Sequence, residues 1–332
     1  MSEVEKSEVE NKEEEKKPQK KIKPFVAFIA ILLVLALVGF STLFHYSFSM
    51  TPKMIIVKTE SGISIVNNPE FMEIKAGEIE EGLAELVTPE GGVAIPVEWG
   101  DLGKRMIEAG IIDKNKFYTL HEKRGGFGVY EKGLLEKEDN GHIMINAENA
   151  NTILNVMWAL GLANKNTILE EGPMVDERYG GDASKFASTG GWTLAEGSVM
   201  DHYSNHEFFT LTDEQQALVE EVSKNIYRPC CGNSVHFPDC NHGMAMLGLM
   251  ELMASQGATE QEMYDTALAV NSFWFPDNYM TIGKYFAKRG VTWNEIDSKE
   301  ILGSMYSGSQ GYAQIAREVE PVRSGGGGSC GV

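Results

Sequence analysis

A run of twenty uncharged residues, from Phe25 to Phe44, constrains the fold of this chain more than any other feature. At a rise of about 1.5 Å per residue, a helix of this length is about 30 Å long and matches the hydrocarbon core of a bilayer. A buried core helix is one alternative, but the run has no polar face. A cleaved signal peptide is another, although the run is longer than an ordinary signal core. We therefore predict a transmembrane anchor over residues 25–44.

The tail before this run, residues 1–24, contains seven glutamates and seven lysines and has no net charge. It has too little apolar content to form a core, so we expect it to be disordered. The lysines next to the apolar run place the tail in the cytoplasm by the positive-inside rule. These features predict a single-pass protein of the cell membrane whose remaining 288 residues are extracytoplasmic.

The overall formal charge is −19, and none of it comes from the neutral tail. A strongly acidic extracytoplasmic part does not favour a large phosphate-binding surface, so we expect no nucleic-acid partner. The hydrophobic fraction of 42% is ordinary for a folded protein and excludes disorder throughout.

The fold class predicted from the pattern is mainly α, with a small β-containing portion at the start of the extracytoplasmic part. Residues 45–145 are expected to be mixed α/β, because Met54–Val66 is rich in β-branched residues around a Ser-Gly turn. A short helix is predicted over Trp99–Gly110, and residues 121–142 are expected to form a loop or hairpin.

Residues 146–323 are predicted to form a helical domain. A helix is expected over Asn146–Gly161, with Gly161 as its stop signal, and a long loop over 172–194. Capping boxes predict three further helix starts, at Thr212, Thr259 and Thr292. The other expected helices are Gly243–Ser255, Asn278–Arg289 and Gln310–Val319, and a flexible glycine-rich arm with a cysteine follows over 324–332.

The densest chemical feature is the segment Pro229–Gly243, which reads PCCGNSVHFPDCNHG. Thiolates and imidazoles bind thiophilic ions such as copper or zinc. The leading hypothesis is therefore a metal site, for which the candidate ligands are Cys230, Cys231, Cys240, His242, His236 and Cys330. The spacing is not that of a C-x2-C zinc motif, so the pattern alone does not identify the ion.

Three alternatives use the same cysteines. Thiol–disulfide exchange with a redox partner protein is one, with Cys240, at the start of a predicted helix, and Cys330 as the redox candidates. Structural disulfides in a scaffold or adhesion protein are another, because an extracytoplasmic compartment is oxidising. The last is a Cys240 nucleophile with His242 as its base, although such partners are usually distant in sequence. Whether the chain is an enzyme stays open.

A secondary metal candidate is the pair His202 and His206. Residues four apart share one face of a helix, so the two imidazoles could bind one ion. The glutamate of the H-E-x-x-H motif is replaced by Tyr203, so protease chemistry is not indicated. A polar loop is the simpler interpretation.

The segments PCC, DCNHG and Ser-Cys-Gly at residues 329–331 resemble a group of bacterial membrane-anchored proteins. In that group the same elements stand at similar spacing, with a glycine-rich C-terminal arm. No activity is assigned to the group. The resemblance implies that these cysteines belong to one architecture, and it implies no reaction.

Overall fold

The computed structural model describes residues 54–59, 62–67, 80–125 and 127–319. Two compact units are present, one within residues 1–79 and the other within 80–332. The predicted tail, the predicted anchor and the C-terminal arm lie outside the described residues. Within the described ranges, no helix is both long and apolar enough to span a bilayer.

The described part of the first unit is one antiparallel pair, β1 (Met54–Thr59) and β2 (Gly62–Asn67). The pairing runs in register from Met54 opposite Asn67 to Thr59 opposite Gly62. This confirms the short strands predicted over Met54–Val66, where β-branched residues favour an extended backbone.

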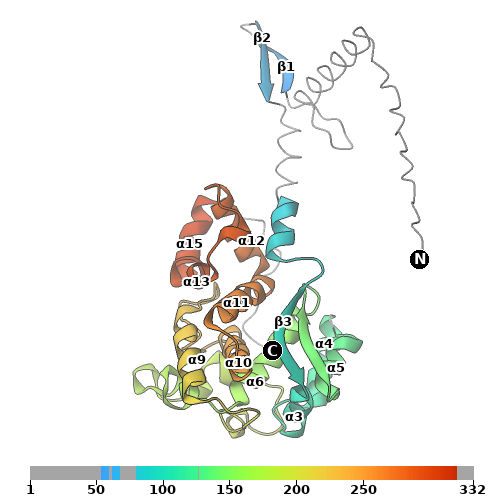
Figure 1. Cartoon of the computed structure of the whole chain (residues 1–332), viewed down its shortest axis with the longest axis vertical. Coiled ribbons are helices and arrows are strands. Elements are labelled where there is room, and N and C mark those ends of the chain that lie inside the picture. Colours follow the sequence, from blue (N-terminus) through green and yellow to red (C-terminus); the bar gives the residue numbers. More distant parts are fainter. Residues whose placement is uncertain (1–53, 60–61, 68–79, 126, 320–332) are drawn as a thin grey trace, which may run out of the picture. The chain divides into compact units, whose positions relative to one another are not determined.

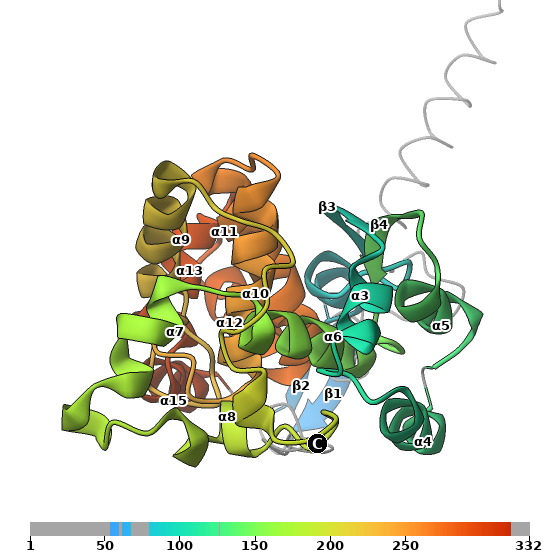
Figure 2. The same cartoon turned by 90° about the horizontal axis from the view of Figure 1, so that it is seen from below.

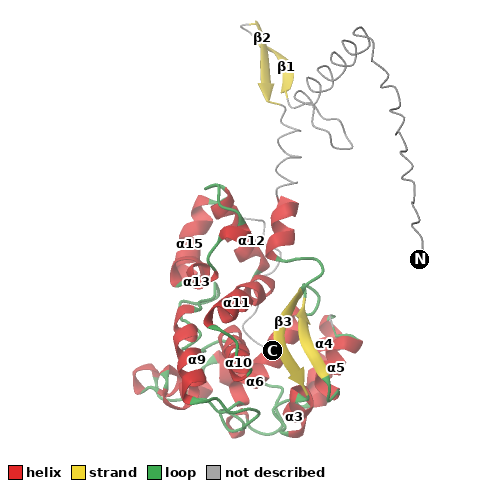
Figure 3. Ribbon diagram, in the orientation of Figure 1, coloured by secondary structure: helices red, strands yellow, loops and turns green. Residues whose placement is uncertain are grey.

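The second unit is mainly helical, which confirms the mainly α part of the predicted fold class (Figures 1 and 3). Its centre is the packed pair α6 (Ala150–Ala163) and α10 (Asn241–Ser255), nearly all of whose residues are buried. Figure 2 shows a β pair and α3 to α5 on one side of these two helices, and α9, α11 and α13 on the other.

The central helices approach closely where glycine faces glycine. A Cβ atom on Gly161 would lie 2.1 Å from the carbonyl oxygen of Met244, and one on Gly248 would lie 2.6 Å from the amide nitrogen of Gly161. The prediction that Gly161 ends its helix is therefore wrong, because α6 continues to Ala163. Gly161 is needed instead for the contact between backbones.

The β pair of this unit consists of β3 (Val93–Gly100) and β4 (Asn140–Ile145), which are antiparallel with an irregularity between Ile95 and Glu98. Alternate residues of β3 are buried in the core. The side chain of Gln256 pairs with β3 as a strand would, since it accepts from the backbone N–H of Glu98 and donates to its carbonyl, both at 2.8 Å. On β4, the hydroxyl of Tyr130 accepts a hydrogen bond from the Met144 N–H.

Three helices surround the β pair: α3 (Leu102–Glu108), α4 (Lys114–Arg124) and α5 (Val129–Glu136). The first confirms the helix predicted within Trp99–Gly110. The loop or hairpin predicted over 121–142 is wrong, because that stretch contains the end of α4, all of α5 and the start of β4. The glycines and charged residues of this stretch obscured the helical pattern of α5 in the sequence. The helix packs into the core through the buried Leu134 and Leu135.

All three predicted capping boxes are present, at Thr212, Thr259 and Thr292. The first two begin α9 (Asp213–Asn225) and α11 (Glu260–Trp274). The third begins only a single 3-10 turn, η5 (Trp293–Glu295). The helix α12 (Pro276–Ala287) begins at a proline, as its fixed φ permits.

Most of the remaining elements are short. A helical segment also covers residues 80–87. The stretch 172–194, predicted as a long loop, is a series of tight turns with one short helix. The elements are α7 (Thr167–Glu171), η1 (Pro173–Val175), η2 (Glu177–Tyr179), η3 (Ala183–Lys185), α8 (Ala187–Gly190), η4 (Val199–Asp201), α13 (Ser298–Leu302), α14 (Ser304–Ser307) and α15 (Ser309–Glu318).

Candidate metal centre

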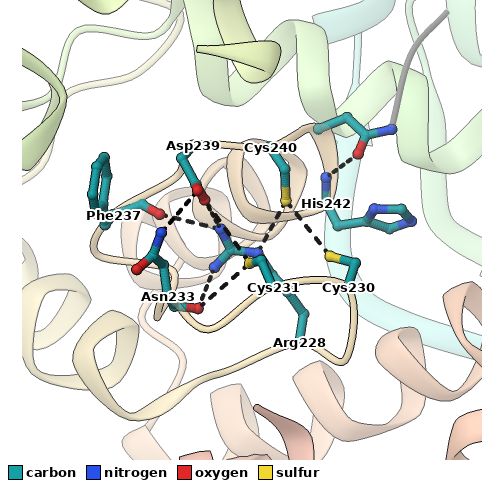
Figure 4. A network of polar contacts seen from close by, with 9 residues as sticks. Arg228, Cys230, Cys231, Asn233, Phe237, Asp239, Cys240 and His242 are labelled. Carbon is teal, nitrogen blue, oxygen red and sulfur yellow. Dashed lines mark hydrogen bonds and ion pairs between the residues drawn. The ribbon is translucent and has the colours of Figure 1, made fainter. Parts of the chain in front are cut away.

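Three cysteines meet where the loop after α9 returns to the start of α10 (Figure 4). The Sγ atoms of Cys230, Cys231 and Cys240 all lie within 4.8 Å of one another, and those of Cys230 and Cys240 are 3.7 Å apart. All three are free thiols. Cys230 is exposed, Cys231 is half-buried and Cys240 is buried, so the cluster extends from the surface into the protein.

Backbone hydrogen bonds on both flanks fix the shape of this loop. Val235 donates to the carbonyl of Ile226 at 2.8 Å, which closes the loop on itself. Ser309, the first residue of α15, donates to the carbonyl of Cys231 at 3.0 Å. The vicinal cysteines are therefore held between α9 and a helix that lies about 80 residues further along the chain.

The guanidinium of Arg228 lies at the centre of the loop and is 1% exposed. Its Nε donates to Cys240 Sγ at 3.2 Å, and its Nη2 donates to Asp239 Oδ1 at 2.6 Å. The remaining donors bind the carbonyls of Asn233 and Phe237. A buried charge requires such compensation. Arg228 thus links the thiol cluster to the rest of the loop.

Gly243, in the first turn of α10, makes room for this arginine. A Cβ atom there would lie 2.5 Å from Nη2 and 2.6 Å from Cζ of Arg228. Cys240 is the N-cap of the same helix, although its side chain makes no cap hydrogen bond. Its sulfur therefore lies at the positive end of a helix dipole, beside a buried cation.

The three thiols differ in acidity. Hydrogen bonds from Cys230 and Cys231, aided by the charge of Arg228, hold the pKa of Cys240 well below its ordinary value. The same contacts and burial raise the pKa of Cys230. The hydrogen bond with Cys230 lowers the pKa of Cys231, but the bond with Cys240 and burial outweigh it and raise that pKa to about 11. Of the three, Cys240 is therefore the thiol that ionises most readily.

Asp239 partly neutralises the positive charge of Arg228. It accepts from Asn233 Nδ2 at 2.8 Å as well as from the guanidinium. Burial raises the pKa of Asp239, against the opposing effect of Arg228. The direct partner of this carboxylate is the arginine.

The two histidines predicted as ligands of the same site lie beside the sulfur cluster rather than in it. His242 is buried against the ring of Phe275, with ring centroids 4.4 Å apart, and its Nδ1 has no hydrogen-bond partner. His236 lies near α9, where burial and the charge of Lys224 lower its pKa. Among the described residues, the group of close ligand atoms consists of the three sulfurs. Cys330 lies outside the described residues.

The secondary candidates, His202 and His206, face each other with 3.0 Å between Nδ1 of the first and Nε2 of the second. Nε2 of His202 lies 2.8 Å from the carbonyl oxygen of Glu196 and donates to it. The pair satisfies its own hydrogen bonds within a loop. No third ligand joins them in the described part of the chain.

The spacing of the sulfurs suits a metal ion. Bonds of about 2.3 Å from tetrahedral zinc to sulfur separate the sulfurs by about 3.8 Å. The distance between Cys230 and Cys240 is 3.7 Å, so these two need little adjustment. Soft sulfur ligands also favour Cu(I). The described cluster could therefore hold a thiophilic ion.

Sequence reasoning missed Arg228, the most connected residue of the site. Its position two residues before Cys230 was visible, but nothing in the spacing showed that it would be buried. The contact with Gly243 depends on how the loop folds over α10, so the sequence held no signal for it. The family models, the curated proteins and the solved structures with which the chain was compared contain no match.

Proposed function

We propose that this protein binds a thiophilic metal ion, copper or zinc, through Cys230, Cys231 and Cys240. The observation that supports this proposal is the convergence of three free Sγ atoms within 4.8 Å of one another. Such a group of unoxidised thiols from two separate points of the chain is an efficient ligand for soft ions.

The charges around the sulfurs support the same proposal. A metal bound by several thiolates carries excess negative charge, and the buried guanidinium of Arg228 offsets part of it. The hydrogen bond from Arg228 Nε also fixes the orientation of Cys240 Sγ. Hydrogen bonds of this kind orient ligands and tune their affinity.

We further propose that the site lies outside the cytoplasm on a single-pass membrane protein. The support is the uncharged run over residues 25–44 with lysines before it. Fractionation of cells that express the full chain, with protease applied to intact cells, tests this. Recovery of the chain in the soluble fraction would contradict it.

Metal analysis of the full chain, purified and reduced under anaerobic conditions, tests the binding proposal. We expect about one equivalent of zinc or Cu(I) after loading and desalting, and loss of the ion in Cys240→Ser. His206→Asn is the control, because it removes an imidazole from the other candidate pair and should leave the ion bound. Failure of the wild-type chain to retain zinc or copper refutes the proposal.

Thiol–disulfide exchange is the second candidate, and the acidity of Cys240 favours it. A thiolate with a neighbouring thiol 3.7 Å away is poised to form a disulfide on oxidation. Titration of the metal-free protein with glutathione redox buffers separates the two. A reversible Cys230–Cys240 disulfide at a mild potential, with no metal retained, would favour exchange.

A further inference from the structure

The thiol cluster offers three sulfur ligands, and among the described residues no fourth ligand atom lies as close. The three are the Sγ atoms of Cys230, Cys231 and Cys240, which lie within 4.8 Å of one another. His242 lies beside the sulfurs, where its ring packs against Phe275. The described site therefore favours an element whose bonding is complete with three sulfurs.

We propose that this site takes trivalent arsenic, which reaches it as arsenous acid, As(OH)3. This inference rests on the proposed function, since it assigns a further class of ion to the same three thiols. Trivalent arsenic is soft and forms three bonds to sulfur in a pyramid, with its lone pair at the apex. It needs no fourth ligand, whereas zinc in structural sites has four.

The positions of the sulfurs fit such a pyramid. Arsenic–sulfur bonds are about as long as zinc–sulfur bonds, about 2.3 Å, and lie nearer to right angles, which separates the sulfurs by about 3.3 to 3.5 Å. The Sγ atoms of Cys230 and Cys240 are already 3.7 Å apart. Cys240 is held by Arg228 (Figure 4). Cys230 is exposed and Cys231 is half-buried, so these two can adjust by rotation about χ1.

The charges beside the sulfurs also favour a trivalent element. Arg228 and Asp239 form an ion pair, 2.6 Å between Nη2 and Oδ1, so the charge of the buried guanidinium is already largely compensated. Three thiolates around a trivalent centre make a neutral complex, whereas they leave one excess negative charge on zinc and two on Cu(I). Burial penalises an uncompensated charge, and Cys240 is buried. The neutral complex therefore has the lowest desolvation cost.

The exchange of ligands is balanced without an oxidant or a reductant. Each of the three S–H groups gives its proton to one hydroxyl of As(OH)3, an arsenic–sulfur bond forms, and one water leaves. Three such steps release three waters and leave arsenic in its trivalent state. Arsenous acid is uncharged at neutral pH, so the net charge of −19 does not repel it. The exposed Cys230 is the sulfur that it meets first.

The test uses the full chain, reduced with a non-thiol phosphine, and sodium arsenite. We expect about one arsenic per chain, with the loss of three titratable thiols. Native mass spectrometry should show the gain of one arsenous acid minus three waters. In Cys231→Ser and Cys240→Ser one hydroxyl stays on arsenic, so each adduct should be heavier by one water. Both variants should bind at least about tenfold more weakly, because a thiol at millimolar effective concentration is lost.

Two further variants test the number of sulfurs and the charge. Cys330→Ser is the matched control, because it removes a cysteine and keeps the three described thiols; weaker binding of arsenite by this variant would overturn the three-sulfur site. Asp239→Asn keeps an oxygen acceptor for Arg228 but leaves the guanidinium charge uncompensated. The affinity for Zn2+ should then rise about tenfold relative to that for arsenite, and an unchanged ratio would overturn the selection of a neutral complex.

The outcomes in the wild-type chain separate this inference from the proposed function. Retention of zinc or Cu(I) without binding of arsenite refutes the inference and leaves the proposed function standing. Binding of arsenite without retention of zinc or copper refutes the proposed function and supports the inference. An adduct that consumes two thiols, with equal affinity in Cys231→Ser, would also refute the inference, because a pair of sulfurs would then suffice.

Discussion

Replacing Gly243 by alanine tests whether the fold of the cysteine loop depends on the fit between α10 and Arg228. The new Cβ would lie 2.5 Å from Nη2, whereas ordinary contacts begin at 3.4 Å, so the guanidinium must retreat by about 0.9 Å. A shift of that size directed away from Asp239 lengthens the 2.6 Å hydrogen bond to about 3.5 Å, the outer limit of hydrogen bonding.

The expected cost follows from two opposing effects. Loss of a charge-assisted hydrogen bond to a buried group costs about 1.5 to 3 kcal/mol. Alanine in place of glycine in a helix stabilises the folded state by up to about 1 kcal/mol. We therefore expect Gly243→Ala to lower the free energy of unfolding by about 0.5 to 2 kcal/mol, measured by urea denaturation. The displaced guanidinium should also raise the pKa of Cys240, which is measured from thiolate absorbance against pH.

Two controls isolate the mechanism. Gly82→Ala, in the helical segment 80–87, meets nothing within 4 Å and should stabilise the protein by up to about 1 kcal/mol. In an Arg228→Ala background, Gly243→Ala should change the free energy of unfolding little, because the guanidinium that the new Cβ would displace is absent. The same loss of stability in both backgrounds would refute the reasoning.

Two further predictions concern parts of the fold that support the site. Gly248→Ala should destabilise the protein by about 1 to 3 kcal/mol in thermal or urea unfolding, because its Cβ would lie 2.7 Å from the Met157 carbonyl at the α6–α10 crossing; an unchanged midpoint would contradict that packing. His121 is fully buried, with Nε2 accepting from Asn155, and burial lowers its pKa to about 4. Between pH 6.5 and 4 the unfolded chain binds a proton at His121 that the folded chain does not. The free energy of unfolding should therefore decrease by up to about 3 kcal/mol as the pH is lowered from 6.5 to 4. His121→Gln should remove that part of the pH dependence of stability.

Sequence patterns predicted the helical class and most helix starts because those features are local. Thr212 and Thr259 each bind the backbone three residues ahead, so their effect is encoded within one turn. Gly161 was misinterpreted because a glycine can end a helix or allow a close crossing, and the choice depends on Gly248, 87 residues away. Periodicity gives no information on such a partner.

At the site, the sequence predicted that the three cysteines of one loop come together, but not which residues organise them. Cys230, Cys231 and Cys240 are close in sequence, so one loop sufficed to join them. The role of Arg228 could not be predicted from the sequence, because it depends on the path of that loop over α10. His242 and His236 are near the cysteines in sequence, yet packing against Phe275 and against α9 places them beside the sulfurs.

The pairing of Gln256 with Glu98 has a consequence for how this protein behaves at high concentration. A two-stranded sheet has two edges whose free N–H and C=O groups can recruit strands from other molecules. The Gln256 amide occupies both backbone groups of Glu98, and the Tyr130 hydroxyl occupies the N–H of Met144 on the other strand. Another chain would have to displace these side chains first, so this small sheet is guarded against edge-to-edge aggregation.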